Sequence, residues 1–557
     1  MNSPKSDRSR SRLEAVMAYH ERSKHHPHRY APSPGYLDWQ TQPDPFRRYD
    51  GSTLVRLDEI PPGGEPEDLN IYNPQGNSCR AIDRSSLSQF FYDALALSAW
   101  KELGSARWSL RVNPSSGNLH PTESYLLAAP VAGLWDSPTL SHYSPFHHGL
   151  EIRAQLSPRD WQELTRGLPG NVLLVGFTSI HWRESWKYGE RAFRYCHHDV
   201  GHAVAALALS ASLLGWQTRY LDGWTDLEIA ALLGVGDQEG PEAEHPDCLL
   251  ALFPAGKAPL LTRTHIPQPA PQLMERLSSL SLSGQPNRLS PQHRSWPAIQ
   301  EVAAATLLTE SGPESSLSSG ARDSHRPAPA AMPGGAARRI IRQRRSAVAM
   351  DGQTSLKREA FFGMMARVLP HPDGAPFGAL SWQPRIHLLL FVHRVEGLEP
   401  GLYCLVRDEA ARDPLQAAMH SDFQWSKPTG CPSDLPLTHL QSADCRATAR
   451  EVSCGQAIAA DGAFALAMIA EFELSLRRYG PWFYKRLHWE AGAIGQVLYL
   501  EAEAAGMRAT GIGCFFDDEL HRIFGLSGTR YQDLYHFTVG GPVHDERLRD
   551  LPPYAHR

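Results

Sequence analysis

The segment from Asn113 to Pro121 carries the residue types that bind a polar ring. It has a proline near each end and a glycine inside, which predicts a loop. Its hydroxyl and amide side chains donate and accept hydrogen bonds, and the glycine lets a ligand approach the backbone closely. A planar heterocycle with carbonyls and ring nitrogens would suit such a loop, and the alternative is a capped turn that binds nothing. The candidate ring-binding residues are Pro114, Ser115, Ser116 and Asn118.

A basic cluster, Arg342-Gln343-Arg344-Arg345-Ser346, stands before the first expected helix of the C-terminal half. Guanidinium groups bind phosphate oxygens in pairs, and a neighbouring hydroxyl adds a further donor. We therefore interpret Arg344, Arg345 and Ser346 as a candidate phosphate clamp.

Two glycines, Gly511 and Gly513, follow the long helix expected in the same half. Because glycine has no side chain, this backbone could lie against the face or edge of a bound ring. So short a pattern is also typical of an ordinary turn.

A lysine and a tyrosine, Lys187 and Tyr188, precede the long helix of the N-terminal half. Such a pair can donate or accept a proton beside a substrate. The alternative is an amphipathic helix start with charged side chains at the surface. The C-terminal half has Tyr484 and Lys485 in reversed order, which leaves open which copy lines a substrate pocket.

A histidine-rich stretch begins the first long helix. His198 and His202 are one turn apart and could ligate a metal, with Asp199 nearby. The helix lacks the glutamate of a zinc-protease motif, and no third ligand is evident. We expect a structural or pocket-lining role and no metal.

The elements that position these residues are indicated by an internal repeat. Asp199-Val200-Gly201 and the apolar positions after it reappear at identical spacing from Glu490-Ala491-Gly492. The chain is therefore a tandem duplication, and its halves share a fold. The small residues around Gly201 and Gly492 could let the two long helices pack on each other as in a fused homodimer, or could serve packing within each domain.

The two copies have lost complementary parts. The C-terminal segment aligned with the 113–121 loop, residues 376–384, lacks its Ser-Ser-Gly-Asn centre. The N-terminal segment aligned with the basic cluster, residues 72–76, has no arginine, and Tyr220-Leu221-Asp222 stands where the other half has its glycines. The clamp thus survives in one copy and the ring loop in the other.

Each half has the same expected order of elements: a helix (87–100; 356–369), a strand (125–128; 386–392), a long helix from Arg191 or Lys485, a short helix and a last strand (248–253; 536–539). A further strand at 172–178 is expected in the first half alone. Helices outnumber strands in this interpretation. It favours an α+β sandwich with a mostly antiparallel or mixed sheet in each of two domains.

Composition sets the domain boundaries. Residues 266–337 are rich in Pro, Ser, Gly and Ala, which predicts a largely flexible linker with a short helix at 299–308. The domains then span residues 50–265 and 338–557, after a polar N-terminal extension at 1–49 whose basic start we expect to be a solvated tail.

Composition also narrows the function classes. The net charge of −5 and the lack of aromatic residues among the N-terminal basic ones argue against nucleic-acid binding. No apolar run reaches the roughly 20 residues of a membrane span, and no signal peptide is evident. The 8 cysteines contain no CxxC pair, which suits a reducing compartment. We expect a cytoplasmic protein.

These motifs together resemble the nitroreductase superfamily of FMN enzymes, and within it the SagB/ThcOx-type dehydrogenases that oxidise azolines in peptide natural products. The similarity is strong locally, at 113–121, 186–216 and 485–513. The resemblance implies FMN as cofactor, with the phosphate on Arg344, Arg345 and Ser346 and the ring between Gly511, Gly513 and the 113–121 loop. In that superfamily clamp and loop come from different subunits, so this chain would keep one composite flavin site and a defunct second one.

The resemblance also implies an activity. Lys187 and Tyr188 match a functional Lys-Tyr pair of the SagB-type enzymes, which favours a dehydrogenase acting on a peptide azoline or a similar organic substrate. A nitro or quinone reductase, and a flavin-free scaffold of a biosynthetic complex, are the alternatives. We expect an intrachain pseudo-dimer that could act as a monomer, with neither nucleic acid nor membrane as a partner.

Overall fold

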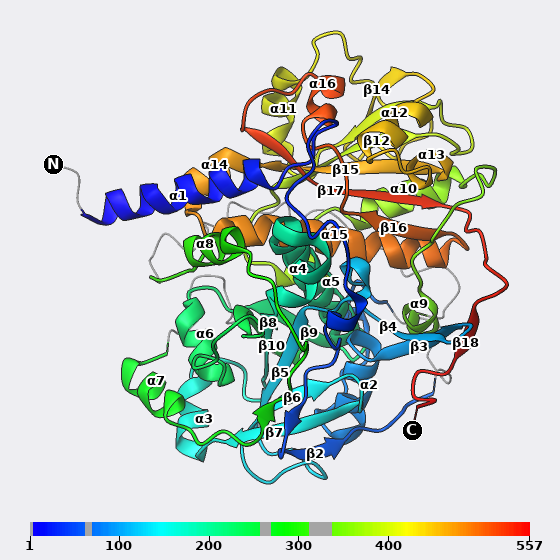
Figure 1. Cartoon of the computed structure of the whole chain (residues 1–557). Helices are drawn as coiled ribbons and strands as arrows, with labels where there is room; N and C mark the ends of the chain where they lie inside the picture. Colours follow the sequence, from blue (N-terminus) through cyan, green and yellow to red (C-terminus); the bar gives the residue numbers. More distant parts are fainter. Residues whose placement is uncertain (1–3, 62–69, 257–268, 311–336, 557) are drawn as a thin grey trace.

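The computed structural model describes residues 4–61, 70–256, 269–310 and 337–556, with side chains from Arg10 onward. In this part of the chain two antiparallel sheets face each other across a pair of long helices (Figure 1). One hydrophobic core runs through both halves. The α+β fold class expected from the sequence is confirmed.

The N-terminal half builds a seven-stranded sheet in the order β2-β7-β6-β5-β8-β10-β9. Its strands are β2 (Thr53–Arg56), β5 (Thr122–Ala128), β6 (Thr139–Ser144), β7 (Gly149–Gln155), β8 (Leu173–Ser179), β9 (Trp216–Tyr220) and β10 (His245–Pro254). The side chains of β5 and β8 are buried throughout, because helices or other chain segments cover both faces of the sheet centre.

The C-terminal half repeats this arrangement in a six-stranded sheet of order β14-β13-β12-β15-β17-β16. Its strands are β12 (Ile386–Val392), β13 (Gly401–Leu405), β14 (Leu437–Ser442), β15 (Phe464–Glu471), β16 (Arg508–Ile512) and β17 (Tyr531–Gly540). The four strands β12-β15-β17-β16 correspond in order to β5-β8-β10-β9. The repeat seen in the sequence is therefore a repeat of the sheet as well.

The helices of the two halves also correspond in order. The N-terminal half has α2 (Arg84–Ala94), α3 (Pro158–Leu164), α4 (His181–Tyr188), α5 (Ala192–Ser212) and α6 (Asp226–Leu233). The C-terminal half has α10 (Arg358–Arg367), α11 (Arg412–Ala418), α12 (Arg446–Val452), α13 (Ile458–Asp461), α14 (Phe472–Tyr479), α15 (Phe483–Ala504) and α16 (Glu519–Phe524). None of the helices in the described ranges has both the length and the apolar character needed to span a bilayer.

Local sequence explains where these helices begin and end. Asp83 accepts a hydrogen bond from the Ser86 N–H and so caps the start of α2. Gly234 and Gly525 end α6 and α16 in the left-handed conformation, which glycine adopts without strain.

The long helices α5 and α15 cross at two glycines. A Cβ on Gly201 would clash with the Trp489 carbonyl, and one on Gly492 would clash with the His198 carbonyl. The two backbones are therefore in direct contact at this point, and the expected packing of the two copies on each other is observed.

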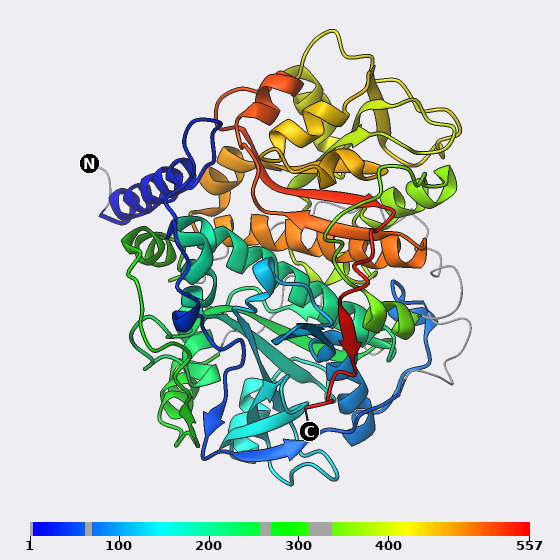
Figure 2. The same cartoon turned by 45° about the vertical axis from the view of Figure 1, so that its right-hand side comes forward.

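Two further segments tie the halves together. α9 (Ala337–Gln343) opens the second half but packs on the first, where Arg338 and Arg342 both pair with Asp93. At the other end of the chain β18 (Arg549–Leu551) joins β3 (Leu97–Leu103) and β4 (Ala106–Arg111) in a three-stranded sheet (Figure 2).

The N-terminal segment is part of the body. α1 (Pro4–Arg22) packs on α8 (Pro297–Ala305), where the Arg12 Nε donates to the Ala305 carbonyl at 2.9 Å. Tyr19 and His20 are buried, so the residues after Arg10 do not form a solvated tail.

Several expectations about the elements are wrong. The helix expected at 87–100 ends at Ala94, and Leu97 begins strand β3. The second half does have a strand equivalent to β8, namely β15, and several edge strands were missed because their pairing partners are distant in sequence.

Part of the expected linker is ordered. Residues 269–310 contain α7 (Pro271–Ser278), β11 (Gln285–Pro286), which pairs with β1 (Tyr49–Asp50), and α8. Their anchors are apolar side chains such as Leu273 and Val302, which are fully buried. The expectation of flexibility for residues 311–336 lies outside the described residues.

Candidate functional site

The basic cluster of the second half reaches the ring loop of the first. Arg344 lies at the end of α9, is 4% exposed, and donates to the carbonyls of Val112 (3.1 Å) and Arg111 (3.2 Å). These two residues directly precede the 113–121 loop. Arg345 donates to the carbonyl of Ser98 at 3.0 Å. The structure thus brings together the two parts that the copies retained separately.

The guanidinium groups are dehydrated and incompletely paired. Burial lowers the pKa of Arg344 and lowers that of Arg345 to about 10. Arg344 Nη1 and Arg345 Nε have no hydrogen-bond partner. Buried N–H groups without acceptors are unfavourable, and an anion that accepted from both would remove this cost.

Tyr499 on α15 connects the clamp to the glycines. Its hydroxyl lies 3.0 Å from Ser346 Oγ and accepts from the Gly511 N–H at 2.9 Å. A Cβ on Gly511 would clash with the hydroxyl of Tyr535, so only glycine fits at this point of β16. Neither tyrosine was identified from the sequence.

The 113–121 loop uses most of its polar atoms to hold its own shape. Ser116 donates to Asp199 Oδ1 from its N–H (3.0 Å) and from its hydroxyl (3.2 Å). The Asn118 side chain donates to the Ser109 carbonyl at 2.8 Å, and Ser115 Oγ accepts from the His120 N–H at 2.8 Å. Ser115, Ser116 and Asn118 therefore shape the loop, while Pro114 is buried at its start.

The loop is compact because its backbone turns in the left-handed region. Gly117, Asn118 and His120 have φ values of 58°, 60° and 52°. Buried His120 keeps a free acceptor, since its Nδ1 has no partner while its Nε2 lies 3.0 Å from Asn118 Oδ1.

Gly513 meets the first half through Tyr195 of α5. The Gly513 carbonyl accepts from the Tyr195 hydroxyl (2.9 Å) and from Arg191 Nε (3.2 Å). The ring of Tyr195 makes an edge contact with that of Tyr188, at 4.8 Å between centroids. The glycines of one half, the tyrosines and the ring loop of the other are thus contiguous.

Lys187 and Tyr188 end helix α4 at the exposed tip of the loop. A Cβ on Gly117 would lie 2.5 Å from the Tyr188 hydroxyl and 3.1 Å from Lys187 Nζ. Both side chains are partly exposed. Burial and nearby Glu184 raise the pKa of Tyr188 well above its ordinary value, so this hydroxyl keeps its proton at neutral pH.

Two buried carboxyl groups lie behind this pair. Burial raises the pKa of Asp199 to about 7, although hydrogen bonds from Ser115 and Ser116 oppose the shift. Burial and Asp199 raise the pKa of Glu184 as well. Neither Glu184 oxygen and only one Asp199 oxygen has a partner. The two groups can therefore hold protons near the loop at neutral pH.

Tyr484 and Lys485 lie elsewhere and are not the counterparts of Lys187 and Tyr188. Buried Lys485 pairs with Asp226 at 2.7 Å, and the Tyr484 hydroxyl lies 3.2 Å from His20 Nδ1. α4 ends at Tyr188 before Gly189, just as α14 ends at Tyr479 before Gly480. The structural counterpart of the pair is therefore Arg478-Tyr479, in unreversed order.

The comparisons with known proteins agree with this geometry. Residues 397–541 match the family model described as Nitroreductase family. A protein of Methanocaldococcus jannaschii described as a nitroreductase is 27% identical over 150 residues, which cover 26% of this chain and 69% of that protein. The second half of the chain therefore contains a region that matches the nitroreductase family.

The fold similarity extends over both halves. A solved structure described as a nitroreductase from Anabaena variabilis superposes with a TM-score of 0.66 at 21% identity, over 95% of this chain and 99% of that one. At this identity the likeness shows the fold. The nitroreductase superfamily comprises oxidoreductases that generally use a flavin, and the expected resemblance is confirmed at this level.

The donor set of the clamp fits a flavin phosphate. Arg344 and Arg345 offer unpaired buried N–H groups, Ser346 offers an exposed hydroxyl, and the Gly511 and Gly513 backbone faces the ring loop across Tyr195. The carbonyls of Ser98, Arg111 and Val112 accept from other nitrogens of these guanidinium groups, so a phosphate could bind the unpaired Arg344 Nη1 and Arg345 Nε without displacing them. A cavity of about 920 Å³ lies elsewhere, between α10 and the end of α15, beside Arg367 and Glu501.

The pseudo-symmetric place, where the superfamily fold would put a second site, is filled by side chains. Glu490 is the counterpart of Asp199 and binds Arg407 and the indole N–H of Trp382. Arg486 pairs with Asp222 at 2.8 Å and stacks on Trp382. In this region the charged side chains of Glu490 and Arg486 are thus paired with other protein groups.

The histidines considered as metal ligands have other roles. His198 stacks on Tyr535 with ring centroids 4.2 Å apart, and His202 lies 3.3 Å from both Gln496 Oε1 and the Tyr535 hydroxyl. Burial lowers the pKa of both rings. They pack α5 against the second half.

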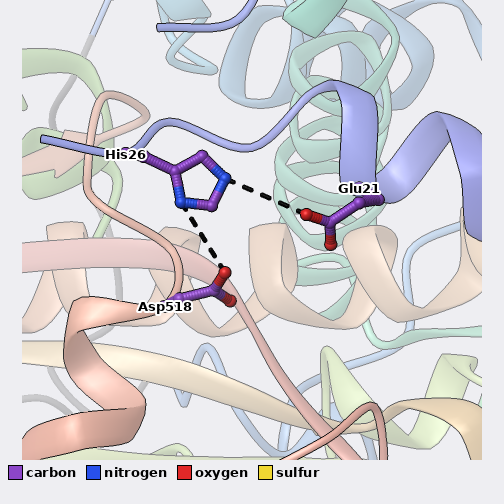
Figure 3. A group of neighbouring side chains, drawn as sticks. All are labelled: Glu21, His26 and Asp518. Atoms are coloured by element: carbon purple, nitrogen blue, oxygen red, sulfur yellow. Dashed lines mark ion pairs between the residues drawn. The ribbon is translucent and has the colours of Figure 1, made fainter. Parts of the chain in front are cut away.

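Three side chains of types that ligate metals, Glu21, His26 and Asp518, lie close together near the surface (Figure 3). Its two carboxylates are already paired with Lys24, at 3.0 Å and 2.9 Å. The ammonium group of Lys24 bridges the two carboxylates, and this contact connects the end of α1 to the second half.

Proposed function

We propose that the protein is an FMN-dependent oxidoreductase with one composite flavin site, built from the clamp of the second half and the ring loop of the first. The observation that carries the proposal is the contact of buried Arg344 with the carbonyls of Val112 and Arg111. It supports a site that neither half could complete alone.

In this proposal each half supplies a different function. Arg344, Arg345 and Ser346 hold the phosphate through charge-assisted hydrogen bonds. Gly511 and Gly513 offer bare backbone to the ring, and the 113–121 loop closes the site from the other half. Bound FMN would supply the acceptor or donor of a hydride.

In this proposal Lys187 and Tyr188, at the exposed tip of the loop, donate or accept the proton of the reaction. The position of both side chains beside Gly117 and their partial exposure support this role. Tyr188 keeps its proton at neutral pH and can donate it, while Asp199 and Glu184 hold further protons behind it. This arrangement favours a dehydrogenase of the SagB type acting on a peptide azoline. The catalytic role considered for Tyr484 and Lys485 finds less support, because Lys485 is buried in its ion pair with Asp226.

Anaerobic mixing distinguishes this activity from the alternatives. FMN-reconstituted protein is mixed with a peptide containing a thiazoline or oxazoline ring, and loss of the flavin's visible absorbance is followed. A dehydrogenase bleaches with the azoline peptide, and the azole product appears by mass spectrometry. Bleaching only with a nicotinamide donor, followed by turnover with nitroarenes or quinones, would establish a reductase instead. A protein that binds no FMN would be a scaffold.

A further inference from the structure

Two cysteines lie together at the end of the glycine segment. Cys514 directly follows Gly513, and its thiol lies beside that of Cys454, which comes just after α12. Both side chains are partly exposed. The sequence alone does not indicate this pair, because the two cysteines are 60 positions apart.

Backbone contacts fix these two segments side by side. The Phe516 N–H donates to the Val452 carbonyl at 2.8 Å. The Gln456 amide donates to the carbonyls of Cys514 and Ser453, both at 2.8 Å. The proximity of the thiols is therefore enforced by the fold, and Cys454 is held there with a φ of 54°.

His25 is oriented to donate to one of the two sulfurs. The Ala31 N–H donates to His25 Nδ1 at 2.9 Å, so this nitrogen is unprotonated and the neutral ring carries its proton on Nε2. The ring also lies beside the Cys514 thiol. Because Nδ1 accepts from the backbone, Nε2–H is the donor that the ring can offer to the sulfur.

The surrounding charges favour a thiolate at Cys514. Arg191 lies near it and shares its charge with Asp517, while Tyr30 approaches Cys454. Tyr188 and Tyr195 also face this region, and Arg194 lies over the ring of Phe515, the residue after Cys514. The neighbouring Cys454 thiol and the His25 ring lower the pKa of the Cys514 thiol, whereas the pKa of the Cys454 thiol is raised.

The other cysteines differ from this pair. Burial raises the pKa of Cys196, Cys248 and Cys404 and keeps them from solvent, and it also raises the pKa of partly exposed Cys431. Cys431 hence matches Cys514 in exposure but lacks a thiol partner and an imidazole donor among the contacts described for it.

We propose that Cys514 and Cys454 form a redox-active dithiol that exchanges with low-molecular-weight disulfides. The Cys514 thiolate attacks one sulfur of the small disulfide. A mixed disulfide forms between Cys514 and that sulfur, and the other sulfur leaves as a thiolate. Cys454 loses its proton to solvent and attacks Cys514 Sγ, which releases the second thiolate and closes a Cys454–Cys514 disulfide. The dithiol is oxidised by two electrons, and the small disulfide is reduced to two thiols. This chemistry uses no flavin and so is independent of the proposed function.

Reaction with oxidised glutathione tests the exchange. Reduced full-length protein is incubated with it at pH 7, alkylated and mapped by peptide mass spectrometry. The wild type and Cys431→Ser should give a 454–514 cross-link and release two glutathiones per chain. Cys454→Ser should stop at glutathione on Cys514, and Cys514→Ser should leave Cys454 free. No cross-link in the wild type, or equal modification of Cys431, would overturn the proposal.

Alkylation rates test the thiolate assignment in the wild-type protein, so this experiment does not depend on the folding of a variant. At pH 6 a haloacetamide should label Cys514 at least about tenfold faster than Cys431, because the thiolate is the nucleophile. His25→Asn should slow labelling of Cys514 without changing that of Cys431. Equal rates for the two cysteines in the wild type would contradict the thiolate assignment.

Discussion

Asp199 and Glu490 occupy the same position of the two long helices but have opposite surroundings. Glu490 accepts hydrogen bonds from Arg407, the Trp382 indole and the backbone N–H groups of Arg385 and Ile386. Asp199 accepts from Ser116 through one oxygen, and its Oδ2 is buried without a partner. The carboxyl group at this position of the repeat is fully hydrogen-bonded in the second copy, at Glu490, and incompletely hydrogen-bonded in the first, at Asp199.

This difference predicts opposite effects of neutral substitutions. Asp199 has a pKa raised to about 7, so the folded state binds its proton more tightly than the unfolded chain does. Its favourable contribution is complete below about pH 4 and is lost as the pH rises through 7. Asp199→Asn should therefore gain stability relative to wild type between pH 4 and 8, by up to about 4 kcal/mol at about 1.4 kcal/mol per pKa unit.

Glu490→Gln is the matched variant, and it should lose about 3–5 kcal/mol at pH 7 because Arg407 is left buried without its counter-charge. Urea unfolding at several pH values measures both effects. A pH-independent stability difference between Asp199→Asn and wild type would show that Asp199 is ionised throughout.

The helix crossing predicts a steric limit. Gly201→Ala places a Cβ against the Trp489 carbonyl, a backbone atom that can move only with α15. We expect a loss of at least about 1–3 kcal/mol, as for other overpacked cores. Gly236→Ala, where a Cβ would have 3.9 Å of clearance, is the control and should be nearly neutral. Thermal unfolding compares them, and equal melting temperatures would place the two helices farther apart.

The clamp predicts a loss of cofactor affinity. Arg345→Ala should weaken FMN binding by about ten- to a hundredfold, since a charge-assisted hydrogen bond is lost, and Arg344→Ala should act in the same direction. Arg394→Ala removes another guanidinium that donates to backbone carbonyls, those of Ala460 and Gly462, and should leave affinity unchanged. Fluorescence titration with FMN measures each constant. Wild-type affinity in the double arginine variant would show that the phosphate binds elsewhere.

If Lys187 and Tyr188 transfer the proton, their loss should slow the reaction without weakening FMN binding. Replacing them with Ala and Phe should leave FMN bound but slow flavin reduction by the substrate by about 10²–10⁴-fold, the range of general acid–base groups. Arg478→Ala with Tyr479→Phe alters the structural counterpart and should reduce at the normal rate. Stopped-flow absorbance follows the reaction. Slow reduction in a Tyr484/Lys485 variant alone would move the proton chemistry to the other copy.

The sequence predicted the site best where one copy could be compared with the other. The complementary loss of the basic cluster and of the Ser-Ser-Gly-Asn centre is a local pattern, and the structure brings the retained parts into contact. Tyr499 was not identified from the sequence. Its counterpart in the first copy is Ala208, so the comparison of the two copies could have shown a tyrosine hydroxyl that only one copy has.

Other features depend on contacts between segments that are distant in sequence. β18 pairs with β3 across almost the whole chain, and no local pattern specifies such a partner. The apolar residues of α7 and α8 are too few to outweigh a Pro- and Ser-rich composition, so the order of residues 269–310 was not foreseen. The counterpart of Lys187 was misassigned because Tyr484-Lys485 resembles it in composition, whereas the offset that relates Asp199 to Glu490 relates Tyr188 to Tyr479.

The stoichiometry of bound flavin tests the central claim most directly. Purified full-length protein is saturated with FMN and desalted, and released flavin is counted per chain after denaturation. The account predicts one FMN per chain, lost in the Arg344→Ala/Arg345→Ala double variant and retained in Arg486→Ala at the filled pseudo-symmetric place. Two FMN per chain would show that both ancestral sites bind, and a protein that retains none would contradict the composite flavin site altogether.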